Sequence, residues 1–167
     1  MSLNSITVKP FSIEYQQAVE DLVLPIQREE FGLEITRDEQ TELIDVAGVF
    51  QRGKGNFWIA LDGENLIGTI GVIDIANDQV ALKKMFVHND YRRRGVAQSL
   101  MNVTIQWCKE KGVQQIFLAT NSKMIAAQAF YEANGFKELP KCDLPAAFPI
   151  ASVASKFYLR NLYIDRI

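Results

Sequence analysis

The chain has 167 residues, of which 48% are hydrophobic, 23% charged and 10% aromatic, and this ordinary globular composition excludes a disordered, collagen-like or disulfide-stapled chain. Eighteen basic and 20 acidic residues give a formal net charge of −2, so no overall basic excess draws the chain to nucleic acid or to an anionic membrane. Cys108 and Cys142 lack metal-ligand spacing, and no apolar run approaches the roughly 20 residues of a membrane span. We therefore expect a cytoplasmic protein without a metal site.

The first 30 residues predict a strand followed by a helix. Ile6–Pro10 alternates weakly between apolar and polar residues, as a short strand does. Apolar residues then recur at helical spacing up to about Glu30, with Ser12 as the expected N-cap. Pro25 stands inside this pattern and is expected to kink or divide the helix, because proline removes a backbone donor and clashes with the preceding turn.

A second helix is predicted over the next 20 residues. Thr36 followed by Glu39 matches the capping-box pattern of a helix start. Behind it, apolar residues recur at helical spacing: Leu43, Ile44, Ala47 and Phe50. A polar, glycine-containing loop at Gln51–Asn56 then separates this helix from the strands that follow.

Three strands in succession predict an antiparallel meander. They cover Phe57–Leu61, Leu66–Ala76 and Val80–Val87, and turn residues at 62–65 and 77–78 connect them. The middle strand carries two glycines that can mark a bulge: Gly68 and Gly71.

The remaining chain predicts two helices and three strands. In order, these are a helix from Val96 to a stop at Gly112, a strand at Gln115–Ala119, a helix from about Ser122 to Ala133 with a stop at Asn134-Gly135, a strand at Phe136–Glu138, and a strand at Lys156–Leu162. The first helix has one apolar face: Val96, Leu100, Val103 and Trp107. Strand, helix and strand in succession make a parallel crossover. Without a linker or repeat, we expect one domain over residues 1–167, of α+β or α/β class, with a mostly antiparallel sheet.

The segment Arg92–Ala97 has the residue types of a phosphate-binding helix start. The first backbone N–H groups of a helix lack internal partners and lie at the positive end of the helix dipole, so they bind phosphate oxygens. Gly95 and Ala97 lack bulk, and three arginines add positive charge. A diphosphate ligand fits this chemistry. A solvated basic turn, or a small patch for nucleic acid, would show the same residues.

A later segment predicts a thin helix with a tyrosine on one side. Met124, Ala127 and Tyr131 share a helical stripe, and alanines at 126, 127 and 129 leave room for a bulky group against the helix. Tyr131 would then present its hydroxyl to a cleft. A tyrosine on such a helix is also typical of a core or rim residue.

Together, the two segments resemble the general N-acetyltransferase (GNAT) superfamily. Its acetyl-CoA-binding motif, a strand followed by Arg/Gln-x-x-Gly-x-Gly/Ala at a helix start, is matched by Arg92-Arg-Arg-Gly-Val-Ala97. Its later motif, Ala-x-x-Phe/Leu-Tyr-x-x-x-Gly-Phe, is matched by Ala127-Gln-Ala-Phe-Tyr-Glu-Ala-Asn-Gly-Phe136. The resemblance covers roughly residues 5–165 and implies a mixed, mostly antiparallel sheet of about six to seven strands flanked by about four helices.

The resemblance also implies acetyl-CoA as co-substrate and gives roles to matching residues. Backbone groups of Met85, Phe86 and Val87 would pair with the pantetheine arm, as a neighbouring strand would. A bulge in this strand and its separation from the strand at 115–119 would leave those groups free. Amides and guanidinium groups at the helix start would hold the pyrophosphate: Arg92, Arg93, Arg94, Gly95, Val96 and Ala97.

Tyr131 would stand near the CoA sulfur as general acid. Many family members carry an asparagine seven residues earlier, which contacts pantetheine. Here Met124 stands at that position, and Asn121 is the nearby residue that could take over the contact.

By the same resemblance, a neutral primary amine attacks the acetyl carbonyl directly and a thiolate leaves. A lysine-like amine, with a pKa of about 10.4, must first lose a proton, and the N–H of Phe86 or Val87 could stabilise the oxyanion. The candidate bases are each also typical of a solvated surface: Glu30, Glu34, Asp74 and His88. A chain of water molecules could do the same. Cys108 has no histidine partner nearby in the sequence and is expected to pack as a small hydrophobic residue.

The acceptor pocket is expected between the first two helices, the separated strands and the loop at 139–149, where Glu29, Glu30 and Glu34 could attract a cationic amine. A small amine, an amino acid, a peptide N-terminus and a protein lysine all stay open as acceptors, as does an acyl group longer than acetyl. Two other classes compete: an acyl-CoA sensor without turnover, and an interaction protein that binds no CoA. We expect no nucleic-acid or membrane partner, and the last strand could mediate a homodimer.

Overall fold

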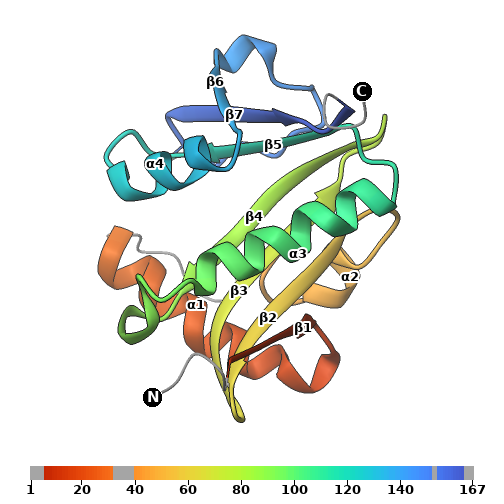
Figure 1. The fold of residues 1–167 in the computed structure, drawn as a ribbon. Coiled ribbons are helices and arrows are strands. Elements are labelled where there is room, and N and C mark those ends of the chain that lie inside the picture. The colour runs from red at the N-terminus through yellow and green to blue at the C-terminus, as the bar shows by residue number, and fades with distance from the viewer. Residues whose placement is uncertain (1–5, 32–39, 152–153, 164–167) are drawn as a thin grey trace.

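The computed structural model describes residues 6–31, 40–151 and 154–163. They form a seven-stranded sheet with the order β1-β2-β3-β4-β5-β7-β6 (Figure 1). The strands are β1 (Ile6–Pro10), β2 (Asn56–Asp62), β3 (Asn65–Asp74), β4 (Gln79–Val87), β5 (Gln115–Thr120), β6 (Lys137–Leu139) and β7 (Lys156–Asn161). Neighbouring strands are antiparallel except β4 and β5, which are parallel. The α+β class, the mostly antiparallel sheet and the parallel crossover are confirmed.

Helices cover both faces of the sheet. They are α1 (Gln16–Phe31), α2 (Val46–Phe50), α3 (Val96–Glu110) and α4 (Ile125–Ala133). Side chains alternate between the two faces of a strand, and along β2 Trp58 packs with the α3 residues whereas Phe57 and Ile59 pack with α1 and α2. Helices α3 and α4 therefore lie on one face, and α1 and α2 on the other. Among the described residues, no helix is long and apolar enough to cross a membrane.

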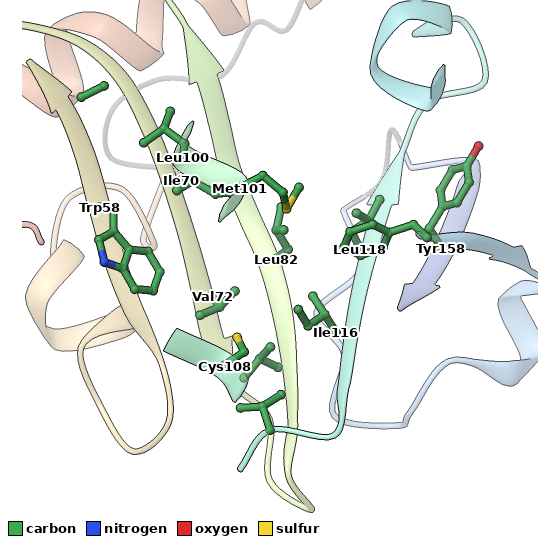
Figure 2. Packing of buried hydrophobic residues seen from close by; sticks show 14 of the residues in the cluster. Trp58, Ile70, Val72, Leu82, Leu100, Met101, Cys108, Ile116, Leu118 and Tyr158 are labelled. Carbon is green, nitrogen blue, oxygen red and sulfur yellow. The ribbon is translucent and has the colours of Figure 1, made fainter. Parts of the chain in front are cut away.

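The apolar core under α3 includes residues from both parts of the sheet, β2 to β4 on one side and β5 with β7 on the other. Figure 2 shows Leu100 and Met101 of α3 beside Ile70 and Leu82, with Ile116 of β5 continuing the apolar layer. The predicted apolar face of α3 is displaced by about one position, because its fully buried residues include Met101, Thr104 and Cys108. Val103 and Trp107 lie at the edge of the core, where the Trp107 indole N–H donates to the Lys54 carbonyl at 2.9 Å.

The start of α1 differs from the prediction. Ser12 precedes a short 3-10 turn at Ile13–Tyr15 and makes no side-chain capping bond, and α1 begins only at Gln16. Pro25 lies inside α1 without dividing it. Its position is exposed, so solvent can satisfy the carbonyl that the missing proline N–H leaves without a donor.

Helix α2 is shorter than predicted. The backbone N–H groups of Leu43 and Ile44 both donate to the Gln40 carbonyl, at 2.9 and 3.1 Å, so this part is a turn. The helix starts at Val46, and the Asp45 side chain caps it. The predicted capping box at 36–39 lies outside the described residues.

Helix α4 also starts later than predicted, at Ile125 rather than near Ser122. The Asn121 side chain accepts from the Lys123 N–H at 2.9 Å, and the Met124 N–H donates to the Asn121 carbonyl at 2.9 Å, which makes residues 121–124 a turn. The predicted stop is confirmed, because Gly135 has φ 84°, a conformation that glycine adopts without a steric cost.

The two glycines predicted to mark a bulge in β3 have different roles. Gly68 follows Ile67, the extra residue where the β2–β3 register shifts. Gly71 lies under two buried rings, and a Cβ added there would stand 2.6 Å from Phe57 and 2.7 Å from Phe50. Gly71 borders the register shift between β3 and β4, and its lack of a side chain is required for packing against these rings.

We expect Gly71→Ala to lower the free energy of unfolding by about 1–3 kcal/mol, because the added methyl forces two well-packed rings apart. Urea denaturation measures this loss. Gly63→Asn is the control, because Gly63 has open space around it at φ 61° and asparagine tolerates that conformation. Equal stability of Gly71→Ala and the parent protein would contradict the packing described here.

Candidate functional site

Strands β4 and β5 pair over a short stretch and then separate. Their register joins Gln79–Ala81 to Gln115–Phe117. Beyond it, the last three residues of β5 pair with Lys156–Tyr158 of β7 on the other side. In the described part of the chain, residues 82–87 of β4 have no strand partner on the β5 side, and Figure 1 shows the two strands moving apart. We call this region the β4–β5 divergence.

A bulge interrupts β4 inside this divergence. Gly71 pairs with Lys83 and Thr69 with Phe86, so one residue of β3 stands opposite two of β4, Lys84 and Met85. Lys84 has φ 56°, which is uncommon for a residue with a side chain. Its carbonyl accepts from the Thr69 hydroxyl at 2.7 Å. The bulge that the family resemblance implied is present in this strand.

The bulge places two lysines together on the face of α1 and α2. Lys83 binds Glu42 at 2.8 Å, and Lys84 lies 3.7 Å from the same carboxylate. Lys84 also donates to the Gln40 side chain at 3.2 Å. Burial lowers the pKa of Lys84, and the charge of Glu42 opposes that shift.

The register after the bulge decides which backbone groups reach the divergence. The His88 N–H donates to the Ile67 carbonyl of β3 at 2.7 Å, and consecutive residues of an antiparallel pair direct their backbone groups to opposite sides. The N–H and C=O of Val87 therefore lie on the side away from β3. Its carbonyl accepts from Arg92 Nε at 3.0 Å. Of the two expected oxyanion donors, this register favours Val87 over Phe86.

A short 3-10 turn at Asn89–Tyr91 leads from β4 to the start of α3. The first intrahelical bond runs from the Ser99 N–H to the Gly95 carbonyl at 3.0 Å, so the N–H groups just before Ser99 lack an acceptor within the helix. Gly95 has φ 83°, and an added Cβ would meet nothing within 4 Å. The backbone conformation, and not a lack of space, therefore requires glycine here. Residues 92–95 are exposed, whereas Val96 is buried and anchors the helix start.

An amide pair holds α4 against the start of α3. Gln98 Nε2 donates to Asn134 Oδ1 at 2.8 Å, and Asn134 Nδ2 donates back to Gln98 Oε1 at 3.2 Å. Asn134 also donates to the Phe130 carbonyl at 2.9 Å, one residue before Tyr131. The contact fixes the helix that carries Tyr131 relative to the helix that begins with Gly95.

Tyr131 packs among aromatic rings on the sheet side of α4. Its ring centroid lies 5.9 Å from Phe130, 5.8 Å from Phe136 and 6.2 Å from Tyr158. The Tyr158 hydroxyl donates to Glu132 at 2.8 Å, but no hydrogen bond of the Tyr131 hydroxyl is found among the described residues. Burial raises the pKa of Tyr131 to about 12. The phenol is therefore protonated at neutral pH and available as a donor.

Of the other candidate residues, Asp74 lies far from this set along β4, whereas His88 follows Val87 directly. The Asp74 side chain accepts from the backbone N–H groups of Lys54 and Ala76, at 2.8 and 2.7 Å, and Asp74 pairs with Val80 near the opposite end of β4 from Val87. His88 is exposed beyond β4, and its Nδ1 accepts from the Asp90 N–H at 3.1 Å. Glu29 is exposed at the end of α1. The Glu30 side chain and Glu34 lie outside the described residues.

Cys108 is fully buried in the core under α3, and burial raises the pKa of its thiol to about 12. A thiol that stays protonated is a poor nucleophile, and the prediction that Cys108 packs as a hydrophobic residue is confirmed. A separate surface hollow lies along β6 and β7. Its lining includes Gly135, Leu139, Leu159 and Arg160, and it contains none of the predicted site residues.

Sequence patterns do not predict three side chains whose hydrogen bonds connect the elements of this site: Thr69, Gln98 and Asn134. Each binds a residue far away in the chain, 15 positions for Thr69 and 36 for the amide pair. No spacing pattern marks such contacts. From the sequence, the Asn134-Gly135 dipeptide predicts only a helix stop.

The known proteins that this chain resembles in sequence and in fold are acetyltransferases. The sequence matches the acetyltransferase (GNAT) family over residues 17–136. The fold is similar to an acetyltransferase of the GNAT family from Staphylococcus aureus, with 39% identity, a TM-score of 0.89 and coverage of 94% of this chain and 99% of that chain. Streptothricin acetyltransferase A of Bacillus subtilis is 29% identical over 71% of this chain and 68% of its own length. Human N-acetyltransferase 8 is 26% identical over 59% of this chain and 46% of its own length, so the chain spans about half the length of the first curated relatives it matches.

We expect the Tyr131 phenol to titrate with a pKa of about 12, observed by ¹³C NMR of tyrosine labelled at Cζ and assigned by the signal lost in Tyr131→Phe. Because this pKa is raised by burial, the folded state holds the proton more tightly than the unfolded state. The resulting stabilisation is complete below about pH 10 and is lost as the pH rises towards 12. Tyr131→Phe should therefore reduce the fall in stability over that range. A Tyr131 signal that titrates at or below pH 10 would contradict the buried position of the phenol.

Proposed function

The chain belongs to the GNAT acetyltransferase family, and we propose that it is an acetyl-CoA-dependent N-acetyltransferase that transfers an acetyl group to a primary amine. The observation that carries this proposal is the β4–β5 divergence. We assign three features to its border: the edge of β4 that has no strand partner among the described residues, the start of α3, and the helix with Tyr131. The pantetheine arm of acetyl-CoA could pair with the β4 edge as a strand does, and its pyrophosphate could bind at the start of α3. The thioester sulfur would then lie near Tyr131.

The residues at the divergence fit the substrate acetyl-CoA. We assign the pantetheine arm to the edge formed by Met85, Phe86 and Val87, where amides of the arm would take the place of a neighbouring strand. We assign the pyrophosphate to Arg92 and to the amides of residues 93–97. Support comes from the helix N–H groups without internal acceptors, the open space at Gly95 and the exposed arginine side chains. Asn121 stays a proposed contact of the arm near the start of α4.

In the proposed reaction, the nitrogen of a neutral amine forms a bond to the acetyl carbon, and the carbon–sulfur bond breaks. The Val87 N–H would stabilise the oxyanion, because its direction is fixed by the β4 register before the substrate binds. Acetyl-CoA supplies the thioester, and the products are an amide and CoA. Asp74 pairs with Val80, near the opposite end of β4 from Val87, so we do not assign the proton of the amine to it. A chain of water molecules is the proposed acceptor of that proton.

Tyr131 is the proposed donor to the departing sulfur. At its buried position, the Tyr131 phenol, with a pKa of about 12, is a weaker acid than a free thiol in water, with a pKa of about 8.5. The apolar surroundings that raise the pKa of the phenol also disfavour a bare thiolate, which reduces this mismatch. Tyr131 therefore acts first as a hydrogen-bond donor to the developing thiolate, and the proton follows as the carbon–sulfur bond breaks.

Binding of acetyl-CoA is the primary test, made by isothermal titration calorimetry. We expect a micromolar dissociation constant, weakened at least about tenfold in Arg94→Glu and in Gly95→Glu, because each places a carboxylate where a charge-assisted hydrogen bond to phosphate would form. Arg52→Glu is the matched control. It makes the same charge change as Arg94→Glu on an exposed residue next to Gly53, which lies against Asp74 near the other end of β4 from Val87. Loss of binding in the control alone, or no binding by the parent protein, would contradict the assignment.

Turnover tests the role of Tyr131, with free thiol detected after mixing acetyl-CoA with a panel of amines. The panel includes small amines, amino acids, peptides, a lysine-rich protein and streptothricin, because the Bacillus relative is named for that compound. We expect Tyr131→Phe to lower kcat by about 100-fold and to change the acetyl-CoA dissociation constant less than about twofold. Equal kcat values would remove Tyr131 from the donor role. Acetyl-CoA binding without thiol release from any amine would favour a sensor.

A further inference from the structure

We propose that Thr69 is a positioning residue whose hydroxyl holds the bulge of β4 and thereby directs the Val87 N–H into the β4–β5 divergence. The inference rests on the proposed function for its link to acetyl-CoA. Thr69 lies on β3 with no exposed surface. Its Oγ1 donates to the Lys84 carbonyl at 2.7 Å, and no sequence motif of the family resemblance includes it.

The bulge determines which residues of β4 serve the divergence. A shift of one residue in an antiparallel pair exchanges the two sides of the strand, both for side chains and for backbone groups. With the extra residue present, Met85 and Val87 pack with the α3 core, and Phe86 packs with the cluster under α1 and α2. Without it, the N–H of Val87 would be directed at β3, and that of Phe86 at the divergence.

The bulge is a conformation that its surroundings must maintain. Lys84 has φ 56°, and residues with a Cβ keep such a conformation only where neighbouring contacts fix it. Its carbonyl also leaves the regular ladder and needs a donor, because a buried carbonyl without a partner is unfavourable. The Thr69 hydroxyl supplies that donor.

The other contacts of Lys84 act on its side chain. Its ammonium group lies 3.7 Å from Glu42 and 3.2 Å from the Gln40 amide oxygen. Both partners belong to the turn before α2, so they restrain the end of a flexible side chain and not the peptide itself. The Thr69 bond is therefore the contact through which the bulge backbone is fixed from β3.

Two substitutions distinguish the effect of the Thr69 hydroxyl from the effect of the side-chain shape. Thr69→Val keeps the shape and removes the donor, whereas Thr69→Ser keeps the donor and removes a methyl group. Thr104→Val is the matched control, because Thr104 is equally buried and its hydroxyl donates to the Leu100 carbonyl at 2.8 Å, inside α3. Each protein is studied by amide hydrogen exchange of residues 82–88, by calorimetric titration of acetyl-CoA and by thermal unfolding.

We expect Thr69→Val to raise amide exchange at Phe86 and His88, whose N–H groups face β3, and to weaken acetyl-CoA binding, by about tenfold each, as the loss of one buried hydrogen bond would. Thr69→Ser and Thr104→Val should stay within about twofold of the parent protein in both measurements, even where their melting temperatures fall. A purely structural role of Thr69 would lower the melting temperature without this selective change.

Parent-like exchange and binding in Thr69→Val would overturn the proposed role of Thr69 and leave the proposed function intact. Equal weakening of binding in Thr104→Val would also overturn it, because general destabilisation would then explain the effect. Absence of acetyl-CoA binding by the parent protein would instead remove the proposed function, and the inference with it.

Discussion

The limited pairing between β4 and β5 is the constraint on which the rest of the structure depends. The two strands share a register over Gln79–Ala81 and Gln115–Phe117 only, and β5 then continues in partnership with β7. A backbone edge inside a sheet is normally paired, because buried N–H and C=O groups need partners. Here the edge of β4 that has no strand partner in the described part of the chain lies between two helices, α3, which comes after β4 in the chain, and α4, which comes after β5 (Figure 1). Strand separation thus leaves a backbone edge beside a helix N-terminus, and to this region we assign the substrate arm and Tyr131.

Two polar contacts keep that region in a defined geometry. The Thr69 hydroxyl fixes the backbone of the bulge, and the Gln98–Asn134 amide pair joins the start of α3 to the end of α4. The apolar core under α3 supports both, since Leu100, Met101 and Ile116 fill the space between the two parts of the sheet (Figure 2). A site that must stabilise a developing charge benefits from donors whose directions are set in advance. Both contacts involve the elements to which the chemistry is assigned, β4 and the start of α3.

Much of this fold could be predicted from local patterns in the sequence. The meander follows from apolar runs and turn residues, the crossover from the order of strand, helix and strand, and the end of α4 from Gly135. The helix starts could not be predicted as well, because hydrogen bonds of neighbouring side chains determine them. The Asp45 carboxylate caps α2 at a later residue than predicted, and the turn at Asn121 makes α4 begin later than predicted. The direction of the Val87 N–H depends on a bulge, whose position requires the register between two strands. Thr69 and the amide pair depend on contacts between distant segments, which no single-segment pattern contains.

Acetyl-CoA titration followed by amide ¹H–¹⁵N chemical shifts tests the central claim most directly, because it locates the ligand without an acceptor amine. The account predicts the largest changes at Val87 and in the first turn of α3, from Gly95 to Gln98, with smaller changes around Tyr131. Changes concentrated at Leu139, Leu159 and Arg160, in the hollow along β6 and β7, would contradict it. They would place the ligand outside the β4–β5 divergence and leave the separated strands without the role described here.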